Sequence, residues 1–368
     1  AVITAAYGNH GDTSYVTGRA LVPILATKIA AGGSHSCGIQ SNGNVQCWGN
    51  NSYGQLGNGS TTDSLTPVTV SGSSSPVNIA AGRYSNCSRF DNGSLKCWGR
   101  NNYGQLGDNT ITDRSSAVSA LASDNFSDFD VGESHACGVL AGDGIKCWGN
   151  NDYGQLGDNS REKKLLPVSV KDISNAQKVA TGWNHSCALM GNGSVACWGK
   201  NFEGQLGNGK SLYTTATVSG LSNAAEIGCG HGFSCARLNN GSIKCWGMNT
   251  QIGVDTNYSQ LSPVSVENIS TASQVSVGYS HTCARLSDST VKCWGSNIYG
   301  QLGNAGSDDS RTPVVVSGIS TAIQVAAGNN HSCAVLSDKT IKCWGNNLYG
   351  QVGDGSSLQK KYTPVSVN

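Results

Sequence analysis

Cysteine and histidine recur at fixed spacing along this chain of 368 residues. Both side chains bind metals, form covalent links or titrate near neutral pH. Fourteen of the 15 cysteines fall into pairs ten residues apart, and Trp-Gly follows the second member of every pair. The pairs are Cys37 and Cys47, Cys87 and Cys97, Cys137 and Cys147, Cys187 and Cys197, Cys235 and Cys245, Cys283 and Cys293, and Cys333 and Cys343.

Two chemistries compete for these cysteines. A lone pair ten residues apart, without a second pair or a spaced pair of histidines, is a poor zinc signature. Seven identical spacings predict one disulfide in each repeat and therefore an oxidising compartment, and we expect no metal or cofactor. The loop Ser41-Asn42-Gly43 lies midway between the first two cysteines, so a three-residue hairpin would place them directly opposite each other. Cys229 has no partner in this pattern, and we expect it to be a packed free thiol. The alternative is that it forms an intermolecular disulfide.

The histidines share one position, two residues before the first cysteine of a pair. A ring of imidazoles there would bind a metal or titrate together, but we expect a structural hydrogen bond repeated within each repeat. Ser85 and Phe233 replace histidine in two repeats, which favours the structural role. The histidines are His35, His135, His185, His281 and His331.

The sequence contains no catalytic motif that we can identify. It has no Gly-x-Ser-x-Gly elbow, no His-Glu-x-x-His, no phosphate loop and no paired-carboxylate motif, so we expect no catalytic residues and no enzyme. A net charge of +1 gives no electrostatic reason to bind nucleic acid, and no apolar run approaches a membrane span. Because the chain begins at Ala1 without methionine, we expect a mature product, secreted or at the cell surface.

The elements that must position these residues repeat with the cysteines, at steps of 50, 50, 50, 48, 48 and 50 residues. Each repeat offers four short strand signals, as in Gln324–Ala327, His331–Leu336, Thr340–Trp344 and Pro364–Val367. Four antiparallel strands per repeat, seven times over, predict an all-β seven-bladed propeller with one disulfide inside each blade. We place the propeller at residues 29–368 and an N-terminal extension at residues 1–28.

Three motifs recur in order in the repeats, and together they resemble the regulator of chromosome condensation family over about residues 29–368. They are Gly-x-x-His-Ser-Cys, Cys-Trp-Gly and Tyr-Gly-Gln-Leu-Gly, the last of which is lost at Met248–Gly253. The resemblance implies a propeller fold. Nuclear members are exchange factors for a small GTPase and dock on nucleosomes, whereas secreted bacterial relatives include a β-lactamase inhibitor. The disulfide pattern argues against the nuclear role.

Function is expected where the seven copies differ. The two residues after the first strand's glycine vary while their flanks are nearly fixed, so packing sets the flanks and leaves this pair free. If the first strand is innermost, these turns surround the mouth of the channel, and their aromatic and arginine residues favour an interface. The alternative is that these residues belong to ordinary surface turns and bind nothing. The candidate binding residues are Arg83, Tyr84, Glu133, Trp183, His231, Tyr279 and Asn329.

The N-terminal extension is β-prone and lies outside the repeats. It packs on its own propeller or adds a strand to a neighbouring copy, since an unpaired β-prone segment readily augments a sheet edge. Its candidate assembly residues are Val2, Ile3, Tyr7, Tyr15 and Val16. The sequence thus predicts a non-catalytic module for assembly or protein binding, whose partners are proteins or copies of itself. The alternative is a soluble module that recognises a carbohydrate or a protein through the turns.

Overall fold

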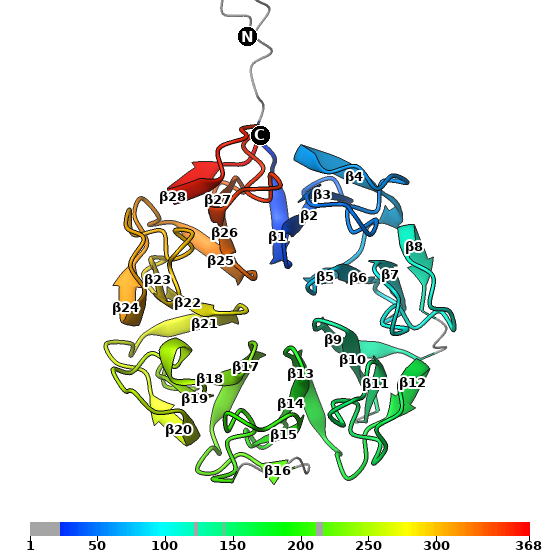
Figure 1. The fold of residues 1–368 in the computed structure, drawn as a ribbon, viewed down its shortest axis with the longest axis vertical. Helices are drawn as coiled ribbons and strands as arrows, with labels where there is room; N and C mark the ends of the chain where they lie inside the picture. The colour runs from blue at the N-terminus through cyan, green and yellow to red at the C-terminus, as the bar shows by residue number, and fades with distance from the viewer. Residues whose placement is uncertain (1–22, 121–123, 143, 211–215) are drawn as a thin grey trace, which may run out of the picture.

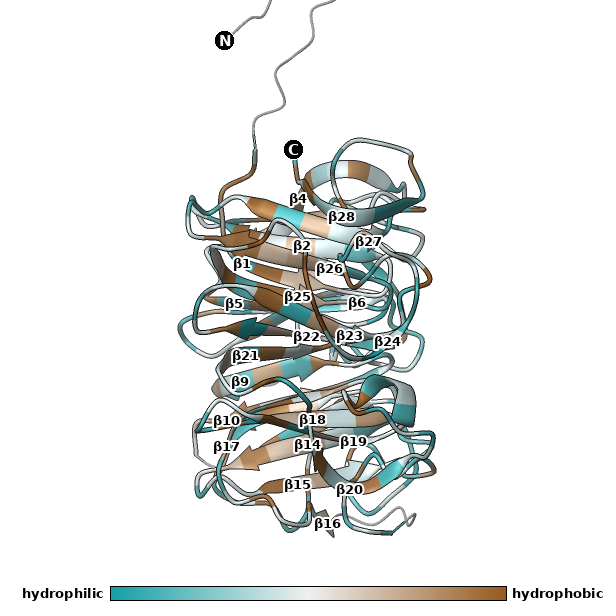
Figure 2. Cartoon of the chain, turned by 90° about the vertical axis from the view of Figure 1, so that its left-hand side faces the viewer, coloured by the Kyte–Doolittle hydropathy of each residue, from teal (hydrophilic) through white to brown (hydrophobic). Residues whose placement is uncertain are grey.

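The computed structural model describes residues 23–120, 124–142, 144–210 and 216–368. Its strands form seven antiparallel sheets of four consecutive strands, arranged as blades around a central channel (Figure 1). Seen on edge, the molecule is a thick disc (Figure 2). The predicted seven-bladed propeller is confirmed.

Blades 1 to 4 each run outward from the channel in chain order. They comprise β1 (Ala26–Ala31), β2 (His35–Gln40), β3 (Asn44–Gly49) and β4 (Ser64–Ser74); β5 (Asn78–Ala81), β6 (Ser85–Arg89), β7 (Leu95–Gly99) and β8 (Arg114–Ser119); β9 (Phe126–Val131), β10 (His135–Leu140), β11 (Ile145–Gly149) and β12 (Lys164–Ser169); and β13 (Ala176–Thr181), β14 (His185–Met190), β15 (Val195–Gly199) and β16 (Ala216–Thr217).

Blades 5 to 7 follow the same plan, and a 3-10 helix, η1 (Asn249–Gln251), replaces part of one loop. They comprise β17 (Ala224–Cys229), β18 (Phe233–Leu238), β19 (Ile243–Gly247) and β20 (Gln260–Ser265); β21 (Ala272–Val277), β22 (His281–Leu286), β23 (Val291–Gly295) and β24 (Ser310–Val315); and β25 (Ala322–Ala327), β26 (His331–Leu336), β27 (Ile341–Asn346) and β28 (Lys360–Ser366).

Each cysteine pair joins the second and third strands of its blade. Cys37 lies directly opposite Cys47 in the β2–β3 register, and the other blades repeat this pairing. The opposed α-carbons are 4.0–4.1 Å apart and all seven disulfides form, as predicted. All fourteen cysteines are buried, because the sheet faces that carry them pack against neighbouring blades.

The hydrophobic core lies between blades. In one cluster, Leu95 and Leu106 of blade 2 pack against Phe126 and Trp148 of blade 3. The indole nitrogen of Trp148 donates a hydrogen bond to the carbonyl oxygen of Gln105 at 2.9 Å, and every blade repeats this bond to the preceding blade. Trp-Gly of one blade and Gln-Leu-Gly of the preceding blade, or its variants Gln251–Gly253 and Gln351–Gly353, therefore form the two sides of each blade junction.

The first and last blades meet in the same way. Trp48 donates to the carbonyl oxygen of Gln351 at 3.0 Å, and Leu25 pairs as an isolated bridge with Thr340 of blade 7. No strand is exchanged between these blades, since each described sheet holds four consecutive strands. Side-chain packing, this short bridge and further hydrogen bonds between blades 7 and 1 therefore close the ring. Residues 1–22, which include the assembly candidates Val2, Ile3, Tyr7, Tyr15 and Val16, lie outside the described residues.

Candidate functional site

The variable turns lie at one end of the channel. We call the residues Gly33, Arg83, Glu133, Trp183, His231, Tyr279 and Asn329 the turn ring. Each follows a glycine at the end of an innermost strand, and neighbouring turns are tied by backbone hydrogen bonds, such as Trp183 N to Gly230 O at 3.2 Å. A Cβ on Gly132 would lie 2.5 Å from the Gly182 carbonyl oxygen, so this close approach requires glycine.

One side of the turn ring is charged. The Arg83 guanidinium forms an ion pair with Glu133 of the next blade at 2.6 Å, and their side chains are 31% and 18% exposed. Burial raises the pKa of the Glu133 carboxyl, while Arg83 opposes that rise. The same guanidinium lies 4.9 Å from the ring centre of Tyr84 and 5.8 Å from that of Trp183. The ion pair is thus continuous with the aromatic side of the ring.

The other side is an aromatic stack drawn from three successive blades. The His231 ring lies 3.8 Å from the Trp183 ring and 4.6 Å from the Tyr279 ring, at 17° to the latter. Burial, together with the nearby positive charges of Lys200 and Arg83, lowers the pKa of His231 to about 4. The imidazole is therefore neutral at physiological pH and stacks as an uncharged ring. Of the predicted binding residues, Arg83, Tyr84, Glu133, Trp183, His231 and Tyr279 are brought together.

Asn329 joins this group only through its backbone. Its N–H donates to the Gly32 carbonyl oxygen at 3.0 Å, across the junction of blades 7 and 1.

Two cationic residues that the sequence analysis missed are Arg100 and Lys200, each of which directly follows a Trp-Gly motif. The Arg100 guanidinium lies 4.6 Å from the Tyr53 ring centre, and the Lys200 ammonium lies 5.5 Å from that of Tyr153. After Trp-Gly, blades 1 and 3 carry Asn50 and Asn150, whereas blades 2 and 4 carry Arg100 and Lys200. This difference between the repeats could have identified the two cations from the sequence.

Below the turn ring, the innermost strands line a channel cavity of about 340 Å³. Its carboxylates have structural partners in the next blade: Asp128 accepts from Val179 N at 3.0 Å, and Asp130 from Thr181 N at 2.7 Å. Burial raises the pKa of Asp130 to about 6, which these hydrogen bonds oppose. Gln324 similarly accepts from Ile29 N at 3.0 Å across the closing junction. The acids therefore brace neighbouring blades.

The repeated histidines also join blades, which corrects one expectation. We predicted a hydrogen bond within each repeat, whereas His135 Nε2 bonds Ser186 Oγ of the next blade at 2.8 Å. The Ser186 hydroxyl donates onward to Gln155 O at 3.0 Å, so the histidine is the donor in the first bond. Equivalent bonds join His35 to Asn86, His185 to Ser234, His281 to Ser332 and His331 to Ser36. The prediction was wrong because each imidazole points across the blade junction, where its partner lies about 50 residues away in the sequence.

One group of side chains that could bind a metal ion includes the unpaired cysteine. Candidate ligand atoms of His185, Cys187 and Cys229 lie within 4.8 Å of one another. Cys187 is already bonded to Cys197, and His185 Nε2 is hydrogen-bonded to Ser234. Cys229 is a buried free thiol, and burial raises its pKa well above the ordinary value. These partners leave a packed thiol, not a set of free metal ligands.

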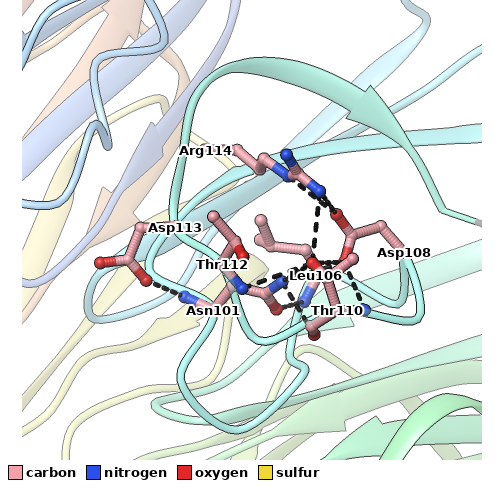
Figure 3. Close-up of polar contacts among 7 residues, drawn as sticks. All are labelled: Asn101, Leu106, Asp108, Thr110, Thr112, Asp113 and Arg114. Carbon is pink, nitrogen blue, oxygen red and sulfur yellow. Dashed lines mark hydrogen bonds and ion pairs between the residues drawn. The ribbon is translucent and has the colours of Figure 1, made fainter.

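The carboxylates of the β7–β8 loop are likewise occupied. In blade 2, Asn101 Nδ2 donates to Asp108 at 3.0 Å, and Arg114 forms an ion pair with the same carboxylate at 2.8 Å (Figure 3). Asp113 accepts the backbone N–H of Asn101 at 2.7 Å. The carboxylates thus hold the loop in shape.

Within the described residues, no helix has the length and apolarity to cross a membrane.

Solved structures of similar fold come from several kinds of protein. Prp20p from Saccharomyces cerevisiae gives a TM-score of 0.79 at 18% identity, over 94% of this chain and 87% of that one. Human WBSCR16 gives 0.75 at 19%, over 90% and 92%. The CRINKLY WD40 ectodomain of the Arabidopsis thaliana receptor kinase ACR4 gives 0.55 at 18%, over 94% and 99%. At these identities the likeness shows the fold.

Sequence comparison is more specific. A curated relative, the ultraviolet-B receptor UVR8 of Arabidopsis thaliana, is 49% identical over 49 residues, a match spanning 13% of this chain and 11% of the receptor. Sequence models of the regulator of chromosome condensation (RCC1) repeat match residues 26–55, 77–105 and 42–88. The model of the RCC1-like domain matches residues 114–368. Since that match covers most of the chain, this protein belongs to the RCC1-like propeller family.

Proposed function

We propose that this protein is a secreted or cell-surface, non-catalytic interaction module that binds a protein partner through the turn ring. The observation that carries the proposal is the stack of Trp183, His231 and Tyr279 beside the Arg83–Glu133 ion pair at one end of the channel. Aromatic and arginine side chains dominate the energetics of protein interfaces. The interlocked flanks hold these residues on a rigid ring, which limits the entropy lost on binding.

Two further observations support this assignment. Prp20p, the yeast RCC1, is described by its binding to Gsp1p and histones and was also solved with Kap60 bound, so one propeller of this fold binds proteins. The seven disulfides suggest an oxidising compartment, which supports a secreted or cell-surface location.

The test replaces Trp183 and Tyr279 by alanine and compares partner capture from the protein's native extracellular fluid, with Tyr362→Ala on β28 as the control. We expect the double variant to lose the specific protein partners that the control retains, with circular dichroism and oligomeric state unchanged. Unaltered capture would exclude the turn ring. Retained protein capture together with lost binding to a glycan array would favour the alternative, a carbohydrate module.

A second candidate is self-assembly through the N-terminal segment. The outer edge of the fourth strand in each described blade has no partner, and residues 1–22 are β-prone and precede the first blade. Deletion of residues 1–22 tests this candidate by light scattering. Loss of oligomers or polymers with an intact fold would support strand addition, whereas an unchanged monomer would exclude it.

A further inference from the structure

One position of the innermost strands holds a thiol in a single blade. It is the last residue of the strand, which is alanine, valine or threonine in six blades and Cys229 in blade 5. Seven copies of one strand therefore act as their own control for what a thiol adds there. The other six residues are Ala31, Ala81, Val131, Thr181, Val277 and Ala327.

This position packs against the disulfide of the preceding blade. The hydrophobic cluster between blades 6 and 7 contains both Cys283, the first cysteine of blade 6, and Ala327, the last residue of the innermost strand of blade 7. The clusters of five other junctions contain the equivalent two residues. In the cluster between blades 4 and 5 they are Cys187 and Cys229. Only at that junction does a thiol meet a disulfide.

The two sulfur atoms at this junction are close neighbours. Cys229 Sγ lies within 4.8 Å of Cys187 Sγ, which is bonded to Cys197. The Cys229 thiol donates to the carbonyl oxygen of Ala180 at 3.6 Å, and Ala180 lies opposite Cys187 in the β13–β14 register. The Ser234 hydroxyl oxygen lies 3.8 Å from Cys187 Sγ and 3.9 Å from Cys229 Sγ. The thiol is therefore held beside one specific sulfur of the blade 4 disulfide.

We propose that Cys229 exchanges with the disulfide of blade 4. The Cys229 thiolate attacks Cys187 Sγ, the Cys187–Cys197 bond breaks, and a Cys187–Cys229 bond forms. Cys197 leaves as a thiolate and takes up the proton that Cys229 gave up. One disulfide and one thiol are present before and after, so the exchange needs no oxidant or reductant. The product replaces a link inside blade 4 by a covalent link between blades 4 and 5.

Burial restrains this exchange in the closed molecule. Cys229 is 8% exposed, and burial raises the pKa of its thiol well above the ordinary value. Because only the thiolate attacks a disulfide, the closed junction keeps the thiol in its unreactive form at neutral pH. Opening of the junction by heat, or alkaline solution, supplies the thiolate. The exchange is thus a response of one junction to conditions that loosen it.

The cross-linked blades also carry part of the turn ring. Cys229 ends β17 two residues before His231, and the His231 ring stacks on Trp183 of blade 4. The new bond therefore ties together the two blades that supply these rings. The inference goes beyond the proposed function and does not depend on it, because the exchange is measured without any partner.

The test follows the free thiol in the full chain. The protein is warmed at about pH 8.5 to near its thermal midpoint, quenched in acid and labelled with N-ethylmaleimide in urea. Peptic digestion and mass spectrometry without reduction then locate the label. We expect it to move from Cys229 to Cys197, together with a linked Cys187–Cys229 peptide. The rate should rise about tenfold per pH unit below the thiol pKa, since the thiolate fraction does so.

Two variants provide matched controls. Cys229→Ala introduces the residue that blades 1, 2 and 7 carry at this position, and it should leave Cys197 unlabelled. Ala327→Cys places a thiol against the Cys283–Cys293 disulfide, and we expect label to appear on Cys293. An introduced thiol that does not exchange there would overturn the geometric argument.

Three results with the unaltered chain would overturn the inference. The first is a label that stays on Cys229 under conditions that open the fold. The second is equal labelling of cysteines in every blade, because this indicates general scrambling and no preferred partner. The third is a dimer on non-reducing electrophoresis that Cys229→Ala abolishes, because a second copy of the chain is then the partner of the thiol.

Discussion

At the residue scale, a short relay of hydrogen bonds explains the repeated His-Ser-Cys triplet. His135 donates to Ser186, which donates to Gln155 O, the same carbonyl oxygen that Trp198 bonds at 2.9 Å. Blade 5 shows what happens when the histidine is lost: Phe233 takes its place, and the Thr282 hydroxyl of blade 6 is buried without a hydrogen-bond partner among the described residues. The relay therefore joins neighbouring blades, and it is absent between blades 5 and 6.

This relay predicts unequal effects of two similar substitutions. Ser186→Ala removes the acceptor of a buried imidazole N–H, and we expect the free energy of unfolding to fall by about 1–3 kcal/mol. Thr282→Val removes a hydroxyl that has no partner, so we expect a change near zero or a small gain. Urea denaturation at pH 7.5 checks both. Equal losses in the two variants would contradict a role for the relay.

The same histidines make stability depend on pH. Burial lowers the pKa of His135, His185, His281 and His331 from 6.5 to about 3, and that of His35 to about 4. As pH falls below 6.5, these histidines bind protons in the unfolded chain but not in the folded chain. Their contribution to the free energy of unfolding is therefore complete above pH 6.5 and declines toward pH 3. Asp130, with its pKa raised to about 6, acts in the opposite direction, and so do Asp128 and Glu133, whose pKa values burial also raises. His231, with its pKa lowered to about 4, acts in the same direction as the five histidines.

The expected outcome is a fall of the urea midpoint between pH 7.5 and 5. The variant His135→Phe, which copies blade 5, removes one of the five groups and should reduce the slope of unfolding free energy against pH by up to about 1.4 kcal/mol per pH unit. A slope identical to that of the unaltered chain would show that His135 does not stay neutral in the folded state.

At the scale of elements, the sequence predicted most of the fold. The ten-residue spacing predicted that Cys87 and Cys97 oppose each other, since a three-residue loop leaves no other register. The turn ring was also predicted at the channel mouth, because variation between fixed flanks marks a surface turn. The relation between blades could not be predicted: the His135–Ser186 bond, the His231 stack and the cation above Tyr153 join residues about 50 positions apart. Periodicity fixes each blade but not the angle at which blades meet.

At the scale of the whole molecule, the closing junction differs from the other six. Between consecutive blades the chain itself runs across the junction, whereas blades 7 and 1 are joined by side-chain packing, the Leu25–Thr340 bridge and hydrogen bonds such as Asn329 N to Gly32 O. Ile24 is 9% exposed and packs in a cluster with Trp48, Val335 and Val367. The three residues before β1 thus act as a strap over the one junction that has no covalent connection.

Two truncations test the strap. Deletion of residues 1–22 should leave the thermal midpoint unchanged, since Ile24 and Leu25 remain. Deletion of residues 1–25 removes Ile24 and the Leu25 backbone bonds, and the burial lost at Ile24 alone corresponds to about 2–5 kcal/mol. We expect a lower midpoint and faster hydrogen exchange in Ile29–Ala31 than in the equivalent strand Val179–Thr181. The variant Ile24→Ala in the full chain separates packing from the backbone bonds, because it keeps the latter. Equal exchange in the two strands would mean that side-chain packing alone closes the ring as firmly as a continuous chain does.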